Sequence, residues 1–185
     1  DGRYWIGTAN GGINHFQNGK FRAYTTADGL LSNTASPLAV ESDAAVWIGT
    51  PKGLNRVRGP IDGSVTMREG LIDNETFCLL DDERGNYWAN CKRGIWRVNK
   101  KDLHAVADGR MKELPCLTYG AADGMLSTEG NGEHQPSSCR TPDGRFWFTT
   151  TRGVVVVDPK KLIADEVPPL VVLEQVKADG QVIFT

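Results

Sequence analysis

Short apolar or alternating runs separated by turn residues make up most of the chain. One unit predicts four strands, at residues 37–41, 46–50, 53–58 and 64–68, with turns at 43–45, 51–52 and 62–63. A period of two is typical of half-buried strands, and runs of this length between turns are typical of antiparallel sheets. Asn18-Gly19 and Pro142-Asp143-Gly144 favour tight hairpins, and the apolar run at 154–157 fits a strand covered on both faces. We therefore expect an all-β chain.

Three sequence marks recur along the chain in a fixed order. Trp-Ile-Gly-Thr or a variant of it begins at residues 5, 47, 88 and 147, at intervals of 42, 41 and 59. Two further marks are Asp28-Gly29-Leu30, Glu69-Gly70-Leu71 and Asp123-Gly124-Met125, and the pairs Gly12-Ile13, Gly53-Leu54, Gly94-Ile95 and Gly153-Val154. A period of about 40–45 residues with four short strands predicts the blades of a β-propeller.

The recurring tryptophans and glycines have structural roles in this prediction. We expect Trp5, Trp47, Trp88 and Trp147 to pack between neighbouring blades, because a four-stranded sheet cannot bury its faces alone. We expect Gly12, Gly53, Gly94 and Gly153 to adopt positive φ or to allow a close approach of backbone.

The interval of 59 residues contains two insertions. The first, within residues 98–114, predicts a short helix over 102–107, with Asp102 as N-cap and Asp108-Gly109 as its stop, between the third and fourth strands. The second, residues 127–138, is polar and connects one blade's outer strand to the next blade's inner strand. Such connections gather around the central channel of a propeller, so Glu129, Asn131, Glu133, His134 and Gln135 are expected at its mouth.

The repeat rhythm stops after Val157. Residues 159–169, which include Val167-Pro168-Pro169, predict a stiff linker. Residues 170–185 predict the first strands of a separate, truncated β domain with a turn at 178–180. Residues 1–158 would then be the C-terminal blades of a propeller.

Composition narrows the class of protein. The 185 residues carry 21 Lys and Arg against 23 Asp and Glu, a net charge of −2, which excludes a strongly basic nucleic-acid surface. Hydrophobic residues at 39% and charged residues at 24% suit a globular fold, and 21 Gly with 9 Pro suit many turns. No apolar run approaches the roughly 18 residues of a membrane-spanning helix.

The pattern D-G-x-x-W-I-G-T-x-x-G-[LI] followed by D-G-L resembles the two-component regulator propeller repeat over residues 1–158. Residues 167–181 resemble the start of the Ig-like three-tyrosine domain that follows such propellers. The resemblance implies the periplasmic sensor region of a bacterial sensor or hybrid histidine kinase, often with two seven-bladed propellers and often responsive to oligosaccharides. This sequence departs from the repeat at Asp43-Ala44-Ala45 and Ala89-Asn90-Cys91.

A seven-bladed ring needs about 300 residues at this period, so the chain is expected to be an arc of about four blades. The first blade would lack its inner strand, and the fourth has no evident outer strand. We expect exposed blade faces and poor solution behaviour of the isolated chain.

The candidate chemistry is sparse. His15, His104 and His134 do not have zinc-site spacing, and no nucleophile elbow, phosphate loop or dinucleotide fingerprint occurs, so we expect no cofactor, no metal and no catalytic residues. The four cysteines include Cys78 and Cys91, which reflection about the turn at 82–86 places nearly opposite each other. A cross-strand disulfide and two buried thiols are the alternatives.

Three functions follow from these patterns. The first is a non-enzymatic sensor that binds a small molecule or oligosaccharide at the channel mouth, within a parent protein that supplies the other blades, a dimer contact and the membrane anchor. The others are a propeller enzyme of the metal-assisted lyase or lactonase type, using His134 with Glu129 and Glu133, and a protein-interaction propeller. Candidate ligand-binding residues are Asp28, Asn33, Lys52, Asp73, Asn74, Arg93, Asp123, Glu129, Asn131, His134 and Arg152.

Overall fold

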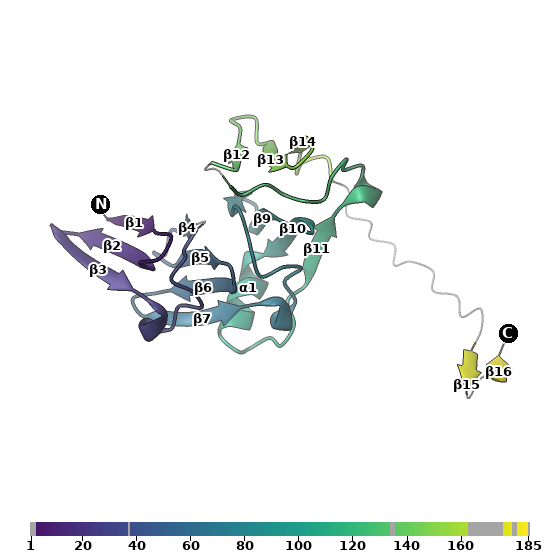
Figure 1. Cartoon of the computed structure of the whole chain (residues 1–185), viewed down its shortest axis with the longest axis horizontal. Helices are drawn as coiled ribbons and strands as arrows, with labels where there is room; N and C mark the ends of the chain where they lie inside the picture. The colour runs from purple at the N-terminus through teal and green to yellow at the C-terminus, as the bar shows by residue number, and fades with distance from the viewer. Residues whose placement is uncertain (1–2, 37, 134–135, 163–175, 179–180, 185) are drawn as a thin grey trace.

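The chain forms a series of small antiparallel sheets in a computed structural model that describes residues 3–36, 38–133, 136–162, 176–178 and 181–184 (Figure 1). The first sheet contains β1 (Tyr4–Gly7), β2 (Ile13–Gln17) and β3 (Lys20–Tyr24), and the second contains β4 (Leu38–Val40), β5 (Val46–Thr50), β6 (Gly53–Val57) and β7 (Ile61–Val65). The third contains β8 (Leu80–Asp81), β9 (Asn86–Cys91), β10 (Gly94–Asn99) and β11 (Cys116–Tyr119). The fourth contains β12 (Ser138–Arg140), β13 (Phe146–Thr150) and β14 (Gly153–Val157), and β15 (Val176–Ala178) pairs with β16 (Gln181–Phe184). The all-β prediction is confirmed.

Each sheet is a meander in which successive strands pair antiparallel. The recurrent tryptophan takes the same register position in all four sheets: Trp5 lies opposite His15, Trp47 opposite Arg56, Trp88 opposite Arg97 and Trp147 opposite Val156. The sequence repeat is therefore a structural repeat, and equivalent positions can be compared from sheet to sheet.

The predicted fourth strand of the second unit was wrong in position. The strand is Ile61–Val65 rather than 64–68, and Met67–Glu69 is a 3-10 helix (η2). The turn comes earlier than expected, at Gly59-Pro60, where the Arg58 N–H donates to the carbonyl of Pro60. Asp62 and Gly63 then belong to the strand: Gly63 pairs with Arg56 of β6, and Asp62 lies in the bulge between that pair and the pair of Val57 with Ile61.

The predicted helix exists between β10 and β11 as α1 (Lys100–Ala107), two residues longer at its start. Asp102 is not its N-cap. Asn99 takes that role, because its Oδ1 accepts a hydrogen bond from the N–H of Lys101 at 2.9 Å. Asp108 ends the helix as the C-cap, and Gly109 follows with φ of 71°.

The glycine that follows each tryptophan strand has positive φ in all four sheets. A Cβ on Gly12, Gly53 or Gly94 would lie 2.0–2.6 Å from the carbonyl oxygen of the residue that ends the last strand of the same sheet, β3, β7 or β11. Only glycine fits at these positions. A Cβ on Gly153 would meet no atom of a described residue within 4 Å, since β14 is the last described strand of the fourth sheet. Residues 163–175 lie outside the described structure. They include most of the predicted linker and the first strand of the predicted C-terminal domain.

Two apolar clusters hold adjacent sheets together. One includes Ile13, Val46 and Ile48 at the junction of the first and second sheets, and the other runs from the second to the fourth sheet around Trp88 and Phe146. Trp47 and Trp88 are fully buried, whereas Trp5 and Trp147 are half-buried. Trp88 contacts Phe146 of the next sheet with ring centroids 5.8 Å apart. Among the described helices, none has the length and apolar character to cross a bilayer.

A candidate ligand cleft where the sheets are connected

The Asp-Gly-Leu motif forms a capped 3-10 turn between sheets. In η1 (Thr26–Asp28), the Asp28 Oδ2 accepts from the N–H of Thr25 at 2.8 Å and from its hydroxyl at 3.1 Å. Glu69 binds Thr66 in the same way in η2, and Asp123 accepts from the N–H of Gly120 at 2.8 Å in η3 (Ala121–Asp123). Asp28 and Asp123 therefore shape the connections between sheets.

Other candidate residues of these connections also bind backbone. Asn33 Oδ1 accepts from the N–H of Thr26 at 2.9 Å, and Asn74 Oδ1 accepts from the N–H of Met67 at 2.8 Å. In both cases the asparagine lies seven residues after the residue whose N–H it binds, so the same contact fixes η1 and η2. Asp73 Oδ1 accepts from the N–H of Glu75 at 3.1 Å, which forms a local turn. These side chains hold loops in shape.

Three sheet-to-sheet connections and three hairpin turns border one cleft of about 400 Å³. The turns are those that follow β5, β9 and β13, and the connections lead into β4, β8 and β12. Glu129 and Asn131 are the predicted ligand-binding residues that line it, together with Glu133. The remaining lining residues are Thr34, Ser36, Thr50, Pro51, Glu75, Thr76, Phe77, Lys92, Gly130, Gly132 and Thr151.

The insertion that carries Glu129 and Asn131 is anchored to two sheets. The N–H of Gly130 donates to the carbonyl of Cys91 at 2.9 Å, and the N–H of Asn131 donates to the carbonyl of Thr149 at 3.1 Å. The Thr149 hydroxyl donates back to the carbonyl of Asn131 at 2.8 Å. A Cβ on Gly130 would lie 2.7 Å from the carbonyl oxygen of Cys91, so the segment lies directly on β9. This border of the cleft is held by backbone contacts.

Charge in the cleft is predominantly negative. Glu75, Glu129 and Glu133 line it, and the one cation among the described lining residues is Lys92, whose Nζ lies 2.8 Å from a Glu75 carboxylate oxygen. The Glu75 hydrogen bond raises the pKa of Lys92, and the charges of Glu75, Asp73 and Glu129 act in the same direction. Thr76 also lines the cleft, and its buried Oγ1 has no hydrogen-bond partner among the described residues.

The other candidates lie elsewhere. Lys52 and Arg93 are exposed on hairpin turns outside the cleft lining, and Arg93 Nη1 lies 3.5 Å from the carbonyl of Ile72. Arg152 and Asp123 border a separate hollow of about 300 Å³ beside β14. His134 and Gln135 lie outside the described residues. The structure thus brings together Glu129 and Asn131 of the candidate set, and adds Glu75, Thr76 and Lys92.

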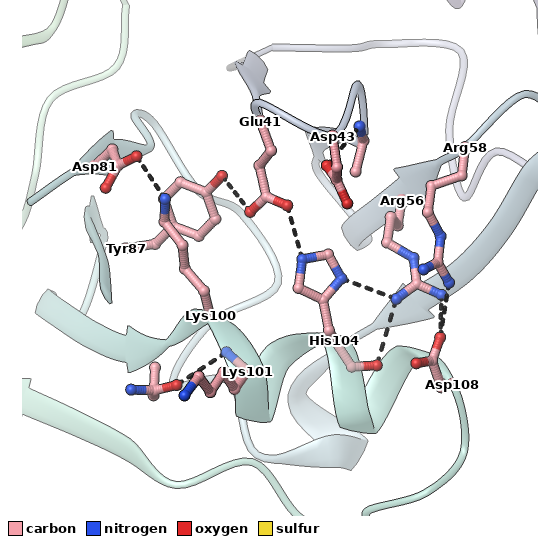
Figure 2. A network of polar contacts seen from close by, with 12 residues as sticks. Glu41, Asp43, Arg56, Arg58, Asp81, Tyr87, Lys100, Lys101, His104 and Asp108 are labelled. Atoms are coloured by element: carbon pink, nitrogen blue, oxygen red, sulfur yellow. Dashed lines mark hydrogen bonds and ion pairs between the residues drawn. The ribbon is translucent and has the colours of Figure 1, made fainter. Parts of the chain in front are cut away.

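A buried polar network between the second and third sheets was not predicted (Figure 2). Arg56 is 1% exposed, and its Nε donates to Asp62 at 3.0 Å. Its Nη1 lies 3.0 Å from His104 Nδ1, and its Nη2 donates to Asp108. Because arginine can only donate, His104 Nδ1 accepts, and the ring proton on Nε2 faces Glu41 Oε2 at 2.7 Å. The sequence signals were a charged residue at a core position and a histidine on the inserted helix.

The network shifts the titration of its carboxyl groups. Burial works to raise the pKa of Glu41, but hydrogen bonds from His104 and Tyr87 outweigh it and lower that pKa. Burial likewise opposes a lowered pKa at Asp62, where the hydrogen bonds from Arg56 and Arg58 prevail. Hydrogen bonds from Arg110 and Arg56 lower the pKa of Asp108, while burial and Glu41 raise the pKa of Tyr87. The network thus favours ionised carboxylates, which accept hydrogen bonds from arginines, from Tyr87 and from His104 Nε2.

The cysteine register differs by one residue from the expected one. Leu80 lies opposite Trp88, which aligns position 78 with Asn90 rather than with Cys91. The offset arises in the turn at 82–86, where Asp82 Oδ1 accepts from the N–H groups of Arg84 and Asn86. All four cysteines are free thiols, and burial raises the pKa of Cys78, Cys91 and Cys116 to about 11.

Within the described ranges, no three His, Cys, Asp or Glu side chains are grouped so that they could hold a metal ion. His134, on which the metal-dependent alternative depends, lies outside those ranges.

Solved structures with the same fold are extracellular domains of bacterial signalling proteins. No family model and no curated protein matches the chain. The extracellular domain of BT3049 from B. thetaiotaomicron, described as a hybrid two component system, matches with a TM-score of 0.66 and 21% identity over 85% of this chain. The extracellular domain of BT4673 from the same organism, described as a one component or hybrid two component system, matches with TM-scores of 0.63 and 0.62 at 19% and 20% identity over 86% of this chain. This chain spans only 20–23% of those chains, and the likeness establishes the fold that it shares with them.

Proposed function

We propose that the chain is an arc of a β-propeller in the periplasmic sensor region of a bacterial two-component-type signalling protein, and that the cleft binds a small polar ligand such as an oligosaccharide. The observation that carries the proposal is the convergence of three successive sheet-to-sheet connections on one cleft. Its border is fixed by backbone bonds and its surface carries polar side chains, as expected of a binding site.

The wider architecture is part of the same proposal. Sheets of equal register, repeated in chain order, fit blades of a larger ring to which the parent protein adds further blades. The extracellular domains of similar fold support an extracytoplasmic sensor. The Ig-like domain, a dimer and a kinase output belong to this proposal, with signal passing from the propeller through the domain that contains β15 and β16.

Isothermal titration calorimetry of the full chain against a panel of oligosaccharides tests the function. We expect at least one member to bind and Asn131→Ala to weaken it, because the amide lies on the cleft border. Asn10→Ala is the matched control, since Asn10 is exposed and lies outside the cleft lining. Absence of heat for every member, or equal weakening by both variants, would contradict the proposal.

A further inference from the structure

Two of the three carboxylates that line the cleft, Glu129 and Glu133, have no cationic partner among the described residues. Outside the cleft, Glu83 pairs with Arg140, Asp143 with Arg145 and Asp81 with Lys100. In the cleft, Lys92 pairs with Glu75, while the side chains of Glu129 and Glu133 form no ion pair or hydrogen bond with a described residue. Two unpaired carboxylates therefore face a concave surface.

A second feature indicates that the cleft receives a hydrogen-bonding ligand. Thr76 is 2% exposed, lines the cleft, and has a hydroxyl without a partner among the described residues. A buried hydroxyl without a partner costs free energy, which a bound polar group would recover.

We propose that this cleft selects ligands that carry positive charge, and in particular amine-bearing sugar oligomers over neutral or acidic ones. The inference rests on the proposed function and names the ligand class of the same site. A concave site lined by one sign of charge concentrates the opposite charge, and ammonium groups donate hydrogen bonds that carboxylates accept. An acidic ligand would instead face Glu129 and Glu133 with the same sign of charge.

Three oligomers of equal length test the preference: glucosamine oligomers with protonated amines, N-acetylglucosamine oligomers and galacturonate oligomers. Titration calorimetry of the full chain at low salt is expected to rank them in that order. The cationic oligomer is expected to bind on the order of tenfold tighter than its acetylated counterpart, as for two exposed ion pairs. Added salt should narrow this difference, because exposed charges are screened.

The double variant Glu129→Gln and Glu133→Gln keeps side-chain size and removes both charges. It should abolish the preference, while the control Glu113→Gln, at an exposed position outside the cleft, should leave it unchanged. Equal affinity for the cationic and neutral oligomers, or a preference that survives the double variant, would overturn the charge inference and leave the proposed function standing. Absence of binding by all three would overturn both, provided that the wider oligosaccharide panel is silent too.

Discussion

The junction between the first and second sheets and the junction between the second and third place a tryptophan at the same register position. At the second junction Trp47 is fully buried, its ring lies 5.3 Å from that of His104, and the opposing Arg56 is bound by residues of α1. At the first junction Trp5 is half-buried and stacks on the opposing His15 with centroids 4.2 Å apart. His15 Nε2 has no partner among the described residues, and a cleft of about 650 Å³ lies beside it.

The difference shows what the repeat determines and what the insertion adds. The repeat places an aromatic ring and its cross-strand partner in each sheet. The helix inserted before β11 then buries one such pair and supplies hydrogen-bond acceptors for a charged residue in the core. The second junction should therefore be the more stable of the two. It should also lose more stability when a charged side chain is removed or when the pH falls.

The largest expected effect is that of Arg56→Ala. Removing the guanidinium leaves Asp62, Asp108 and His104 without their buried donor, and breaking such a network costs about 3–5 kcal/mol. Chemical denaturation measures the change. Arg97→Ala is the matched control, because Arg97 faces Trp88 at the same register and is only half-buried. Equal losses for the two variants would contradict the comparison.

Acid should weaken the second junction next. The pKa values of Glu41, Asp62 and Asp108 are lowered on folding, so their contribution is fully present above the ordinary carboxyl values of 4.5 and 3.8 and is lost as pH falls through the folded values. We expect the free energy of unfolding to fall steadily below about pH 4. Glu41→Gln should reduce the slope of the unfolding free energy against pH in this range. An unchanged slope would contradict the lowered pKa of Glu41.

His104→Ala and His15→Ala compare the two junctions directly. His104 loses hydrogen bonds to Glu41 and Arg56, which should cost about 2–3 kcal/mol. His15 loses its stack on Trp5, which should cost about 1 kcal/mol. Thermal and chemical denaturation of both variants measures the two losses of unfolding free energy. A larger loss for His15→Ala than for His104→Ala would contradict the comparison.

Asn99→Ala is expected to have the smallest effect. The substitution removes the N-cap of α1 and should cost about 1 kcal/mol. Asp102→Ala, at the position expected from the sequence, should cost less, since Asp102 is not the cap. Denaturation of the two variants under the same conditions measures the difference, and a larger loss for Asp102→Ala would contradict the cap assignment.

The sequence predicted the features that repeat. Strand order, the register position of the tryptophans and the positive φ of Gly53 follow from local patterns that recur along the chain. The start of β7 was missed because Asp62-Gly63 is a strong turn pattern that pairing with β6 overrides. The network could not be read because it joins positions 41, 56 and 104, which only the packing of sheets brings together.

Part of the candidate cleft was predictable for a related reason. Glu129 and Asn131 stand in an insertion that breaks the period, and the structure places both on the cleft. Asp28 and Asn33 are polar loop residues of the same kind in the sequence, yet their side chains cap a 3-10 turn. Asn131 also accepts a local backbone N–H, from Glu133 at 3.0 Å, so the two groups differ in whether their loop borders the cleft, which the residue types alone do not determine.

Chemical-shift mapping tests most directly where the ligand binds. Glucosamine oligomer is added to the isotopically labelled full chain, and backbone amide shifts are compared at the two ends of the sheets. We predict shifts at Thr76, Asn131 and Thr151, which line the cleft of about 400 Å³ on the connection side of the sheets. We predict none at Ser42, Ala44 and Gly59, which line the cleft beside Trp5. Shifts confined to the Trp5 side, with the connection side unchanged, would contradict the account.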